Sequence, residues 1–234
     1  TTATVDGKKM RALCLDQASG KMIHDILVFE NEPDDIRFCH PTNSYASPTA
    51  AIEEGTIYVH FGSYGTAALD TATGVKKWER RDLACNHWRG PGSSPVIDQD
   101  RLIVSYDGFD VQYVVAFDKE TGHTVWKKDR NIDYGSDNGD RKKAYSTATI
   151  IEFGGQRQAI LPSATATIAY HPKTGAEIWR VMHGGMNAAA RPLFGHGLLF
   201  ITAGDGARAM VAVRPGGTGD VTQTHIQWEF SKAI

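Results

Sequence analysis

The sequence predicts an all-β protein, a β-propeller of four-stranded antiparallel blades. The phrase Ala-x-Asp-x-x-Thr-Gly-x-x-x-Trp runs from Ala68 to Trp78 and from Ala116 to Trp126, and returns from Ala169 to Trp179 with His171 in the Asp position. The copies recur roughly every 50 residues, which is about the length of a propeller blade. Short runs rich in Val, Ile and Tyr alternate with turn residues, and no stretch carries an apolar stripe of helical period.

Two degraded copies flank these three. Cys14, Asp16, Ser19 and Gly20 fit the same frame with His24 in the Trp position, and the last copy, Ala212, Arg214 and Trp228, carries an insertion around residues 215–224. The whole chain, 1–234, is therefore one propeller domain, in which we expect a partial blade over 1–30 and blades over 45–80, 93–130, 145–181 and 190–231.

The first copy begins in the middle of a blade. We therefore expect about four and a half blades of a propeller of seven or eight, with the remaining blades supplied by missing sequence. We expect such a segment to form an open arc, or a ring closed only by another chain, with exposed strand edges that favour association.

The strands of one blade follow from the turn residues between Trp78 and Trp126. Asp-Gln-Asp, Asp-Gly and Glu-Thr-Gly turns separate four short apolar runs. We expect strands over 94–97, 101–106, 113–118 and 123–127.

The residues of the repeated phrase have structural explanations. Thr-Gly suits the hairpin between the third and fourth strands, because Gly accepts positive φ, and the preceding Asp can accept hydrogen bonds from the turn amides. The Trp of the outer strand can be buried between blades, so we expect Trp78, Trp126, Trp179 and Trp228 to be buried. The structural set is Asp70, Gly74, Trp78, Asp118, Gly122, Trp126, Gly175, Trp179 and Trp228.

The repeat resembles the tryptophan-docking motif of pyrroloquinoline quinone (PQQ) type propellers. This family includes quinoprotein alcohol dehydrogenases and the periplasmic propeller that helps to assemble outer-membrane proteins. The resemblance covers about residues 8 to 230, and the loop over 87–95 further resembles uncharacterised PQQ-like repeat proteins of environmental bacteria. It implies a periplasmic or secreted bacterial protein, and it is specific to the repeat rather than to one activity.

Composition limits the classes of protein to which this chain can belong. A formal net charge of −2 excludes the basic footprint of a nucleic-acid-binding protein, and no apolar run reaches the roughly 20 residues of a transmembrane helix. Cys14 occupies a small-residue position of the repeat, which favours a buried thiol. Cys39 and Cys85 lie in equivalent inter-blade loops, so the sequence allows either a disulfide between them or two free thiols.

A second repeated phrase indicates where a ligand would bind. Ala46-Ser47-Pro48, Ser93-Ser94-Pro95, Ser146-Thr147-Ala148 and Ala190-Arg191-Pro192 end the loops that enter successive blades. Polar residues recur at fixed distances before this phrase, so blade symmetry directs them towards a common axis. The candidate ligand-binding residues are His40, Asn43, His87, Trp88, Arg89, Lys143, Tyr145, His183, Asn187 and Arg191.

These residues allow two interpretations. In the first, the histidines bind a ligand or a metal, while Arg89, Lys143 and Arg191 bind an anion and Trp88 stacks on the ligand. In the second, they line a solvated funnel and bind water. Loops joining second and third strands add His60, Tyr64, Asp107 and Asp110 to the same face.

No residue pattern identifies a catalytic group or a metal site. The acidic loop over 133–140 departs from the EF-hand spacing, and the chain has neither a Gly-x-Ser-x-Gly elbow nor adjacent cysteines of the quinoprotein type. We therefore expect a non-catalytic scaffold that binds a protein partner or a small ligand through its loops. The alternative is a PQQ- and calcium-dependent alcohol or sugar dehydrogenase whose other site residues lie outside this segment. A third hypothesis is carbohydrate binding, with Trp88, Tyr64 and Tyr145 as stacking groups.

Overall fold

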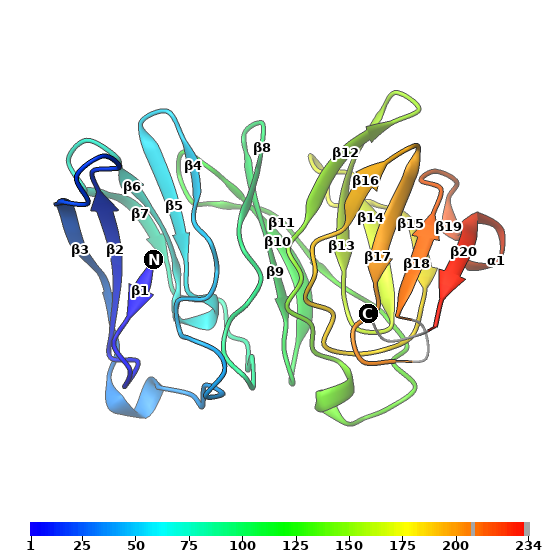
Figure 1. Ribbon diagram of the computed structural model, residues 1–234, viewed down its shortest axis with the longest axis horizontal. Coiled ribbons are helices and arrows are strands. Elements are labelled where there is room, and N and C mark those ends of the chain that lie inside the picture. Colours follow the sequence, from blue (N-terminus) through cyan, green and yellow to red (C-terminus); the bar gives the residue numbers. More distant parts are fainter. Residues whose placement is uncertain (207–208, 232–234) are drawn as a thin grey trace.

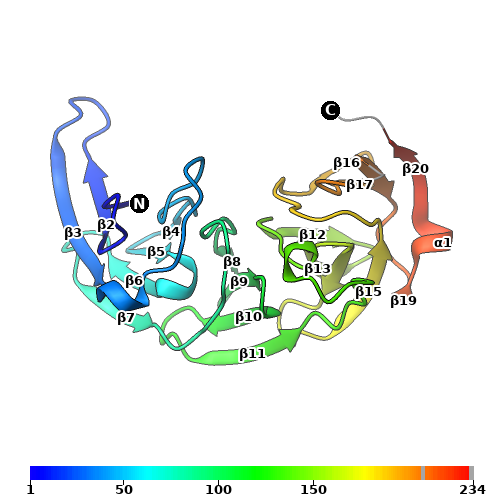
Figure 2. The ribbon, with the colours of Figure 1, turned by 90° about the horizontal axis from the view of Figure 1, so that it is seen from below.

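The structure, a computed structural model, describes residues 1–206 and 209–231 and consists of five β-sheets arranged side by side as an open arc (Figures 1 and 2). This confirms the predicted all-β propeller architecture. Among the described residues, helical structure is limited to single turns, and none of it has the length and apolar character needed to cross a membrane.

The first two sheets form one end of the arc. The first sheet contains β1 (Thr2–Ala3), β2 (Lys9–Leu15) and β3 (Met22–Glu30), and is followed by the 3-10 turn η1 (Pro33–Asp35). The second sheet contains β4 (Ala51–Glu53), β5 (Thr56–His60), β6 (Thr66–Asp70) and β7 (Lys76–Arg80), with the turn η2 (Gly62–Tyr64) between β5 and β6.

The third sheet lies in the middle of the arc. It contains β8 (Val96–Asp98), β9 (Arg101–Asp107), β10 (Gln112–Asp118) and β11 (Thr124–Asp129), and the turn η3 (Gly139–Arg141) follows it. These are the four strands expected between Trp78 and Trp126, with ends that differ by one or two residues from those expected. The largest shift of a strand start is at β8, which begins two residues later than expected. The reason is that the backbone N–H of Ser94 donates to Thr147 Oγ1 of the next blade (2.9 Å) and not to its own sheet.

The last two sheets are linked, because a short strand from the last copy of the repeat pairs with the fourth sheet. The fourth contains β12 (Thr149–Phe153), β13 (Gln156–Pro162), β14 (Ala166–Tyr170) and β15 (Glu177–Met182). The fifth contains β16 (Leu193–Gly195), β17 (Leu198–Thr202), β18 (Met210–Val213) and β20 (Ile226–Phe230). The insertion of the last copy forms β19 (Gly219–Asp220), which pairs in parallel with β15, and the single-turn helix α1 (Thr222–His225).

The order of strands within each sheet places the loops. In Figure 2 the first strands β4, β8 and β12 lie towards the hollow of the arc, while β7, β11 and β15 lie on its convex side. Apolar cores fill the spaces between neighbouring sheets. One core, for example, joins Tyr58 and Ala68 of the second sheet to Leu102 and Phe117 of the third.

The Ala of the repeated phrase lies opposite the Trp. Ala68 pairs with Trp78, Ala116 with Trp126 and Ala169 with Trp179, and the strand register shifts directly after each Ala. A β-bulge at this position increases the local twist of the outer strand. A small residue opposite the indole leaves room for the ring to turn towards the next blade.

The Asp of the phrase forms the hairpin as expected. Asp118 Oδ1 accepts hydrogen bonds from the backbone N–H (2.9 Å) and the hydroxyl (2.7 Å) of Thr121, and Asp70 does the same with Thr73. His171 substitutes for Asp in the third copy by accepting from the N–H of Lys173 through Nδ1 (3.2 Å). An imidazole nitrogen therefore satisfies the same turn.

Two burial predictions were wrong, both at the ends of the arc. Trp228 is 44% exposed and Cys14 is exposed, whereas Trp126 and Trp179 are buried and Trp78 is partly buried. The outer faces of the first and fifth sheets have no neighbouring sheet among the described residues, so the same motif position is buried inside the arc and open at its ends. All three cysteines, including Cys39 and Cys85, are free thiols.

Candidate functional site at the loop face

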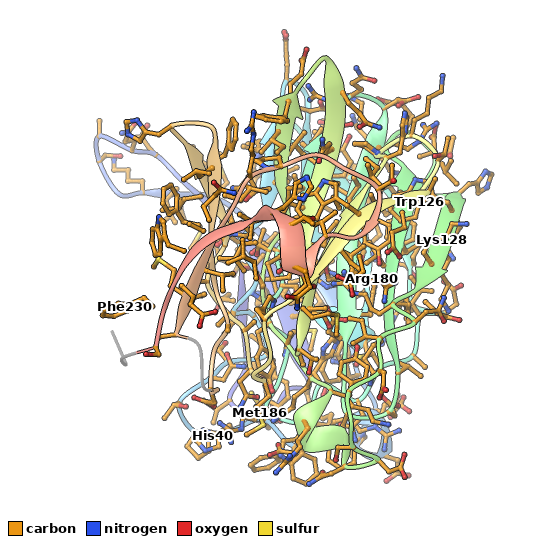
Figure 3. All side chains as sticks on the ribbon, turned by 90° about the vertical axis from the view of Figure 1, so that its right-hand side faces the viewer. His40, Trp126, Lys128, Arg180, Met186 and Phe230 are labelled. Carbon is orange, nitrogen blue, oxygen red and sulfur yellow. The ribbon has the colours of Figure 1, made fainter. Side chains whose placement is uncertain are left out.

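The loops between blades gather at one end of the molecule, which we call the loop face. It consists of residues 31–50, 81–95, 130–148 and 183–192, together with the loops that join second and third strands, and lies at the bottom of Figure 1. Figure 3 shows His40 and Met186, which belong to two different inter-blade loops, at this same end.

One pocket of the loop face brings together four of the predicted site residues. It has a volume of about 330 Å³ and is lined by His40, Thr42, Asn43, Arg89, Gly92, Tyr145 and Ala189. We call it the loop-face pocket. Its walls come from four successive inter-blade loops, and they include His40, Asn43, Arg89 and Tyr145, which the sequence analysis proposed as ligand-binding residues.

The loop that carries Arg89 is held on both sides. The carbonyl oxygen of Arg89 accepts hydrogen bonds from the N–H of His40 (3.2 Å) and from Asn43 Nδ2 (2.8 Å). On the other side, the hydroxyl of Tyr145 donates to the carbonyl oxygen of His87 (3.3 Å). These contacts fix the backbone of the central loop between its two neighbours.

Trp88 is at the centre of a strained turn. Its φ is 61°, and the N–H of Arg89 donates to the carbonyl oxygen of His87 two residues earlier (2.6 Å). A hydrogen bond from residue i+2 to residue i around a positive φ defines the rarer of the two γ-turns. Asn86 Oδ1 supports the turn by accepting from the N–H of Trp88 (3.0 Å). Trp88 and Arg89 therefore project from a rigid backbone.

Arg89 supplies the free charge of the pocket. Its side chain is exposed, and its guanidinium makes no hydrogen bond or ion pair with any other residue that the structure describes. A guanidinium without a partner binds carboxylate or phosphate through two parallel hydrogen bonds. Of the three cationic residues predicted to bind an anion, Arg89 is the one placed to do so.

The predicted histidines differ in their surroundings. His40 lines the pocket and its Nδ1 lies 2.8 Å from Thr42 Oγ1. His87 is buried, and its Nε2 accepts from the N–H of Ser63 (3.1 Å). Burial lowers the pKa of His87 to about 4, so its ring is neutral near pH 7 and turned away from the pocket.

The other two histidines of this face are also buried. His183 Nε2 lies 3.0 Å from Thr167 Oγ1, and its Nδ1 lies 2.7 Å from the carbonyl oxygen of Gly184. His60 Nδ1 lies 2.8 Å from Thr66 Oγ1, and burial lowers the pKa of His60 to about 3. Both rings support loops from within.

Lys143 is not placed to bind an anion. Its side chain is completely buried, and its ammonium donates to the carboxylate of Asp140, to the carbonyl oxygen of Asp140 (3.1 Å) and to Asn187 Oδ1 (2.8 Å). Asn187 in turn donates to Asp205 Oδ2 (2.8 Å). Lys143 and Asn187 thus connect two inter-blade loops, and Arg191 lies apart on the concave wall, where its Nε donates to Thr149 (3.1 Å).

The remaining residues proposed for this face are structural or peripheral. Asp107 forms a buried ion pair with Arg130 (2.6 Å), which donates further to carbonyl oxygens of the fourth sheet. Tyr64 is buried, and its hydroxyl accepts from the N–H of Arg37 (2.9 Å). Asp110 is exposed and accepts from the N–H of Asn86 (2.8 Å).

Two features of this region were missed by the sequence interpretation. Thr42, Gly92 and Ala189 line the pocket, and only their closeness to the aligned positions indicates them. The second repeated phrase forms a seam of inter-blade hydrogen bonds, in which Ser94 Oγ accepts from the N–H of Thr49 (2.9 Å) and Thr147 Oγ1 from Ser94. A hydroxyl residue recurring in one position was the available signal.

Metal ligands do not converge in the part of the chain that the structure describes. No three His, Cys, Asp or Glu side chains there are grouped closely enough to hold an ion. The acidic loop over 133–140 borders a separate hollow with Ile132 and Lys142. Cys85 Sγ lies 3.7 Å from His87 Nδ1, and burial raises the pKa of the Cys85 thiol.

Comparisons with known proteins place this fold. The family model described as outer membrane protein assembly factor BamB matches residues 110–233. The crystal structure of BamB from Moraxella catarrhalis is similar with a TM-score of 0.51 and 17% identity, over 72% of this chain and 46% of that one. No match was found among curated protein sequences.

Two dehydrogenases also share the fold. Quinohemoprotein alcohol dehydrogenase from Comamonas testosteroni matches with a TM-score of 0.53 and 13% identity, over 90% of this chain and 42% of that one. A europium-containing methanol dehydrogenase matches with a TM-score of 0.56 and 14% identity, over 89% and 47%. The chain spans less than half the length of each of these three structures, and at these identities the likeness concerns the fold alone.

Proposed function

Because this chain belongs to the family of outer membrane protein assembly factor BamB, whose members are PQQ-type β-propeller repeat proteins, we propose that it is a non-catalytic scaffold that binds a protein partner through its loop face. The observation that carries the proposal is the rigid turn at Trp88 and Arg89, which presents a half-exposed indole and an unpaired guanidinium to the surroundings.

The distribution of titratable groups favours binding over catalysis. General acid–base catalysis needs a group with a pKa near the working pH that reaches its substrate. His60, His87 and His183 are buried in hydrogen bonds, and the pKa values of His60 and His87 are far below neutrality. What the loop face exposes is a set of aromatic side chains beside an arginine, the residue types enriched at protein interfaces.

The family name bears on the partner and the location. It describes a factor for the assembly of outer membrane proteins. On that analogy the protein is exported to the periplasm or secreted, and its partner is another protein of the cell envelope.

The alternative is a PQQ- and calcium-dependent dehydrogenase, which is favoured by the two dehydrogenases that share the fold. The residues of the loop-face pocket do not fit that cofactor. Trp88 does not line the pocket, and one face of its ring lies against Phe109 with a centroid distance of 5.0 Å. The amide oxygen of Asn43 already accepts from the N–H of Ser44 (2.8 Å) and from the Ser47 hydroxyl, which leaves no carboxylate or free amide oxygen on the pocket wall for calcium.

Site-specific photo-crosslinking in producing cells tests the proposal. A photoreactive amino acid at Phe38 on the loop face should give a discrete crosslinked product, whereas the same group at Val75, an equally exposed residue of a hairpin at the opposite end, should not. Equal products from both positions would contradict loop-face binding. Calorimetric binding of PQQ with calcium, together with alcohol oxidation by an artificial electron acceptor, would replace the scaffold with the dehydrogenase.

A further inference from the structure

We infer that the loop face recognises a peptide segment in which an apolar side chain stands next to a carboxylate. The inference rests on the proposed function and names the chemistry of the partner. Its evidence is a patch of three aromatic rings beside the unpaired guanidinium of Arg89.

The aromatic patch consists of Phe38, Trp88 and Phe109. The rings of Trp88 and Phe109 stack with a centroid distance of 5.0 Å, and Phe38 meets Trp88 edge-on at 6.4 Å. Phe38 is 60% exposed and Trp88 is 44% exposed. Clustered aromatic side chains that remain in contact with water are typical of surfaces that bind another protein, because each ring offers a large apolar area with few rotatable bonds.

The backbone conformation at Trp88 indicates that the indole has a role in binding and not only in folding. A bulky residue with positive φ is a conformational outlier, and such strain concentrates at functional sites. Here the strain is held by Asn86 on one side and by the contacts of the Arg89 carbonyl oxygen with His40 and Asn43 on the other. Gly or Asn would form the same turn at lower cost, so folding alone does not require Trp.

The charge next to the patch identifies the second element of the ligand. Arg89 follows Trp88 directly and lines the loop-face pocket, and His40 connects the two regions because its ring meets Phe38 edge-on at 6.4 Å. A volume of about 330 Å³ accommodates one or two side chains of an extended peptide. An acidic side chain or a C-terminal carboxylate fits the guanidinium, while the neighbouring apolar side chain covers the aromatic patch.

The rigidity of the turn makes this recognition favourable. A loop that is already fixed in its binding conformation loses little entropy when the ligand arrives. The contacts of Tyr145 and Asn43 hold the backbone, so the two recognition side chains keep a constant spacing.

The test uses fluorescein-labelled octapeptides of Gly and Ser with two central residues, measured by fluorescence anisotropy. One series places Trp, Phe or Leu directly before or after Asp, and one ends in a free carboxylate after the apolar residue. Matched series replace Asp with Asn, the C-terminal carboxylate with an amide, or the apolar residue with Ala. We expect the best peptide that contains both features to bind at least tenfold more tightly than either matched peptide.

Three variants separate recognition from folding. Arg89→Gln should abolish the preference for Asp over Asn. Trp88→Asn should weaken binding of the apolar residue at least tenfold, while its melting temperature stays equal or rises because Asn adopts positive φ readily. Arg214→Gln removes an exposed arginine from the loop after β18. It should change neither the preference for Asp over Asn nor the binding of the apolar residue.

The outcomes distinguish the inference from the function on which it rests. Equal affinity for both kinds of carboxylate peptide and their uncharged Asn or amide counterparts, or no peptide binding at millimolar concentration, overturns the inference. A crosslinked partner at Phe38 would then leave loop-face binding intact. Binding of maltohexaose at the same turn, with no peptide binding and no crosslinked protein, overturns both in favour of carbohydrate recognition.

Discussion

Gly122 lies directly against the indole of Trp78, so closely that a Cβ at residue 122 would come within 2.7 Å of the ring. Gly175 stands in the same relation to Trp126, at 2.6 Å. The indole nitrogens complete each contact, because Trp78 Nε1 donates to the carbonyl oxygen of Lys119 and Trp126 Nε1 to that of Pro172, both at 2.8 Å. The hairpins that contain Gly122 and Gly175 therefore pack directly against the Trp of the preceding blade.

The first prediction concerns this close approach. Gly122→Ala should lower the free energy of unfolding by about 2 to 4 kcal/mol, because it combines the cost of positive φ with overpacking against the ring. Gly55→Ala is the matched control. Gly55 has a similar φ of 76° with open space around it, so only the conformational cost of about 1 kcal/mol applies. Urea denaturation measures both, and equal losses would show that the Trp contact is unimportant.

The second prediction concerns the position of each Trp along the arc. Trp126→Ala should cost on the order of 3 to 5 kcal/mol, because the ring is buried between two sheets. Trp228→Ala should cost on the order of 1 kcal/mol, because nearly half of that residue remains exposed. Thermal and urea unfolding of the two variants provide the comparison. A loss below 1 kcal/mol for Trp126→Ala would contradict the docking role.

Periodicity in the sequence was sufficient to predict the blades, because the Asp-Thr-Gly hairpin depends only on local hydrogen bonds. It was insufficient for Trp179, whose Nε1 donates to Gln158 Oε1 (2.8 Å) and not to the next hairpin. The insertion after Arg214 places β19 beside β15 instead, with Val221 buried in the same core. The pairing of β19 with β15 depends on tertiary packing, which the motif does not encode.

The third prediction concerns acid pH. The folded pKa values of His60 and His87, about 3 and about 4, are below the ordinary value of about 6.5, so the unfolded chain binds more protons below pH 6.5. Stability is therefore fully present above pH 6.5 and decreases as the pH falls towards 4. At pH 5 the two histidines together should lower the free energy of unfolding by up to about 4 kcal/mol relative to pH 7.

Unfolding free energies at several pH values test this dependence. His87→Gln should reduce the slope by about half, and His123→Gln, at an exposed hairpin position, should leave it unchanged. A slope that is the same in all three proteins would mean that other groups cause the acid sensitivity.

The candidate site was predictable to the level of the loop and not of the side chain. Of the candidate residues, His40, Asn43, Arg89 and Tyr145 line one pocket. Alignment of the repeats also selected His87 and Lys143, yet their side chains turn into the protein, towards Ser63 and Asp140. Blade symmetry fixes where a backbone lies, whereas the direction of each side chain depends on the neighbouring loop.

The last prediction separates a structural cation from a binding one. Lys143→Met keeps the aliphatic volume but leaves Asn187 and Asp140 without their buried donor, so it should lower the free energy of unfolding by about 1 to 3 kcal/mol. Its affinity for the Asp-containing peptides should remain within twofold of the wild type. Arg89→Gln should show the reverse pattern, with stability unchanged within about 0.5 kcal/mol and the carboxylate preference lost. Loss of peptide binding in Lys143→Met at a temperature where the variant is folded would return Lys143 to the anion site, because a completely buried ammonium acts on a ligand only if the loop opens.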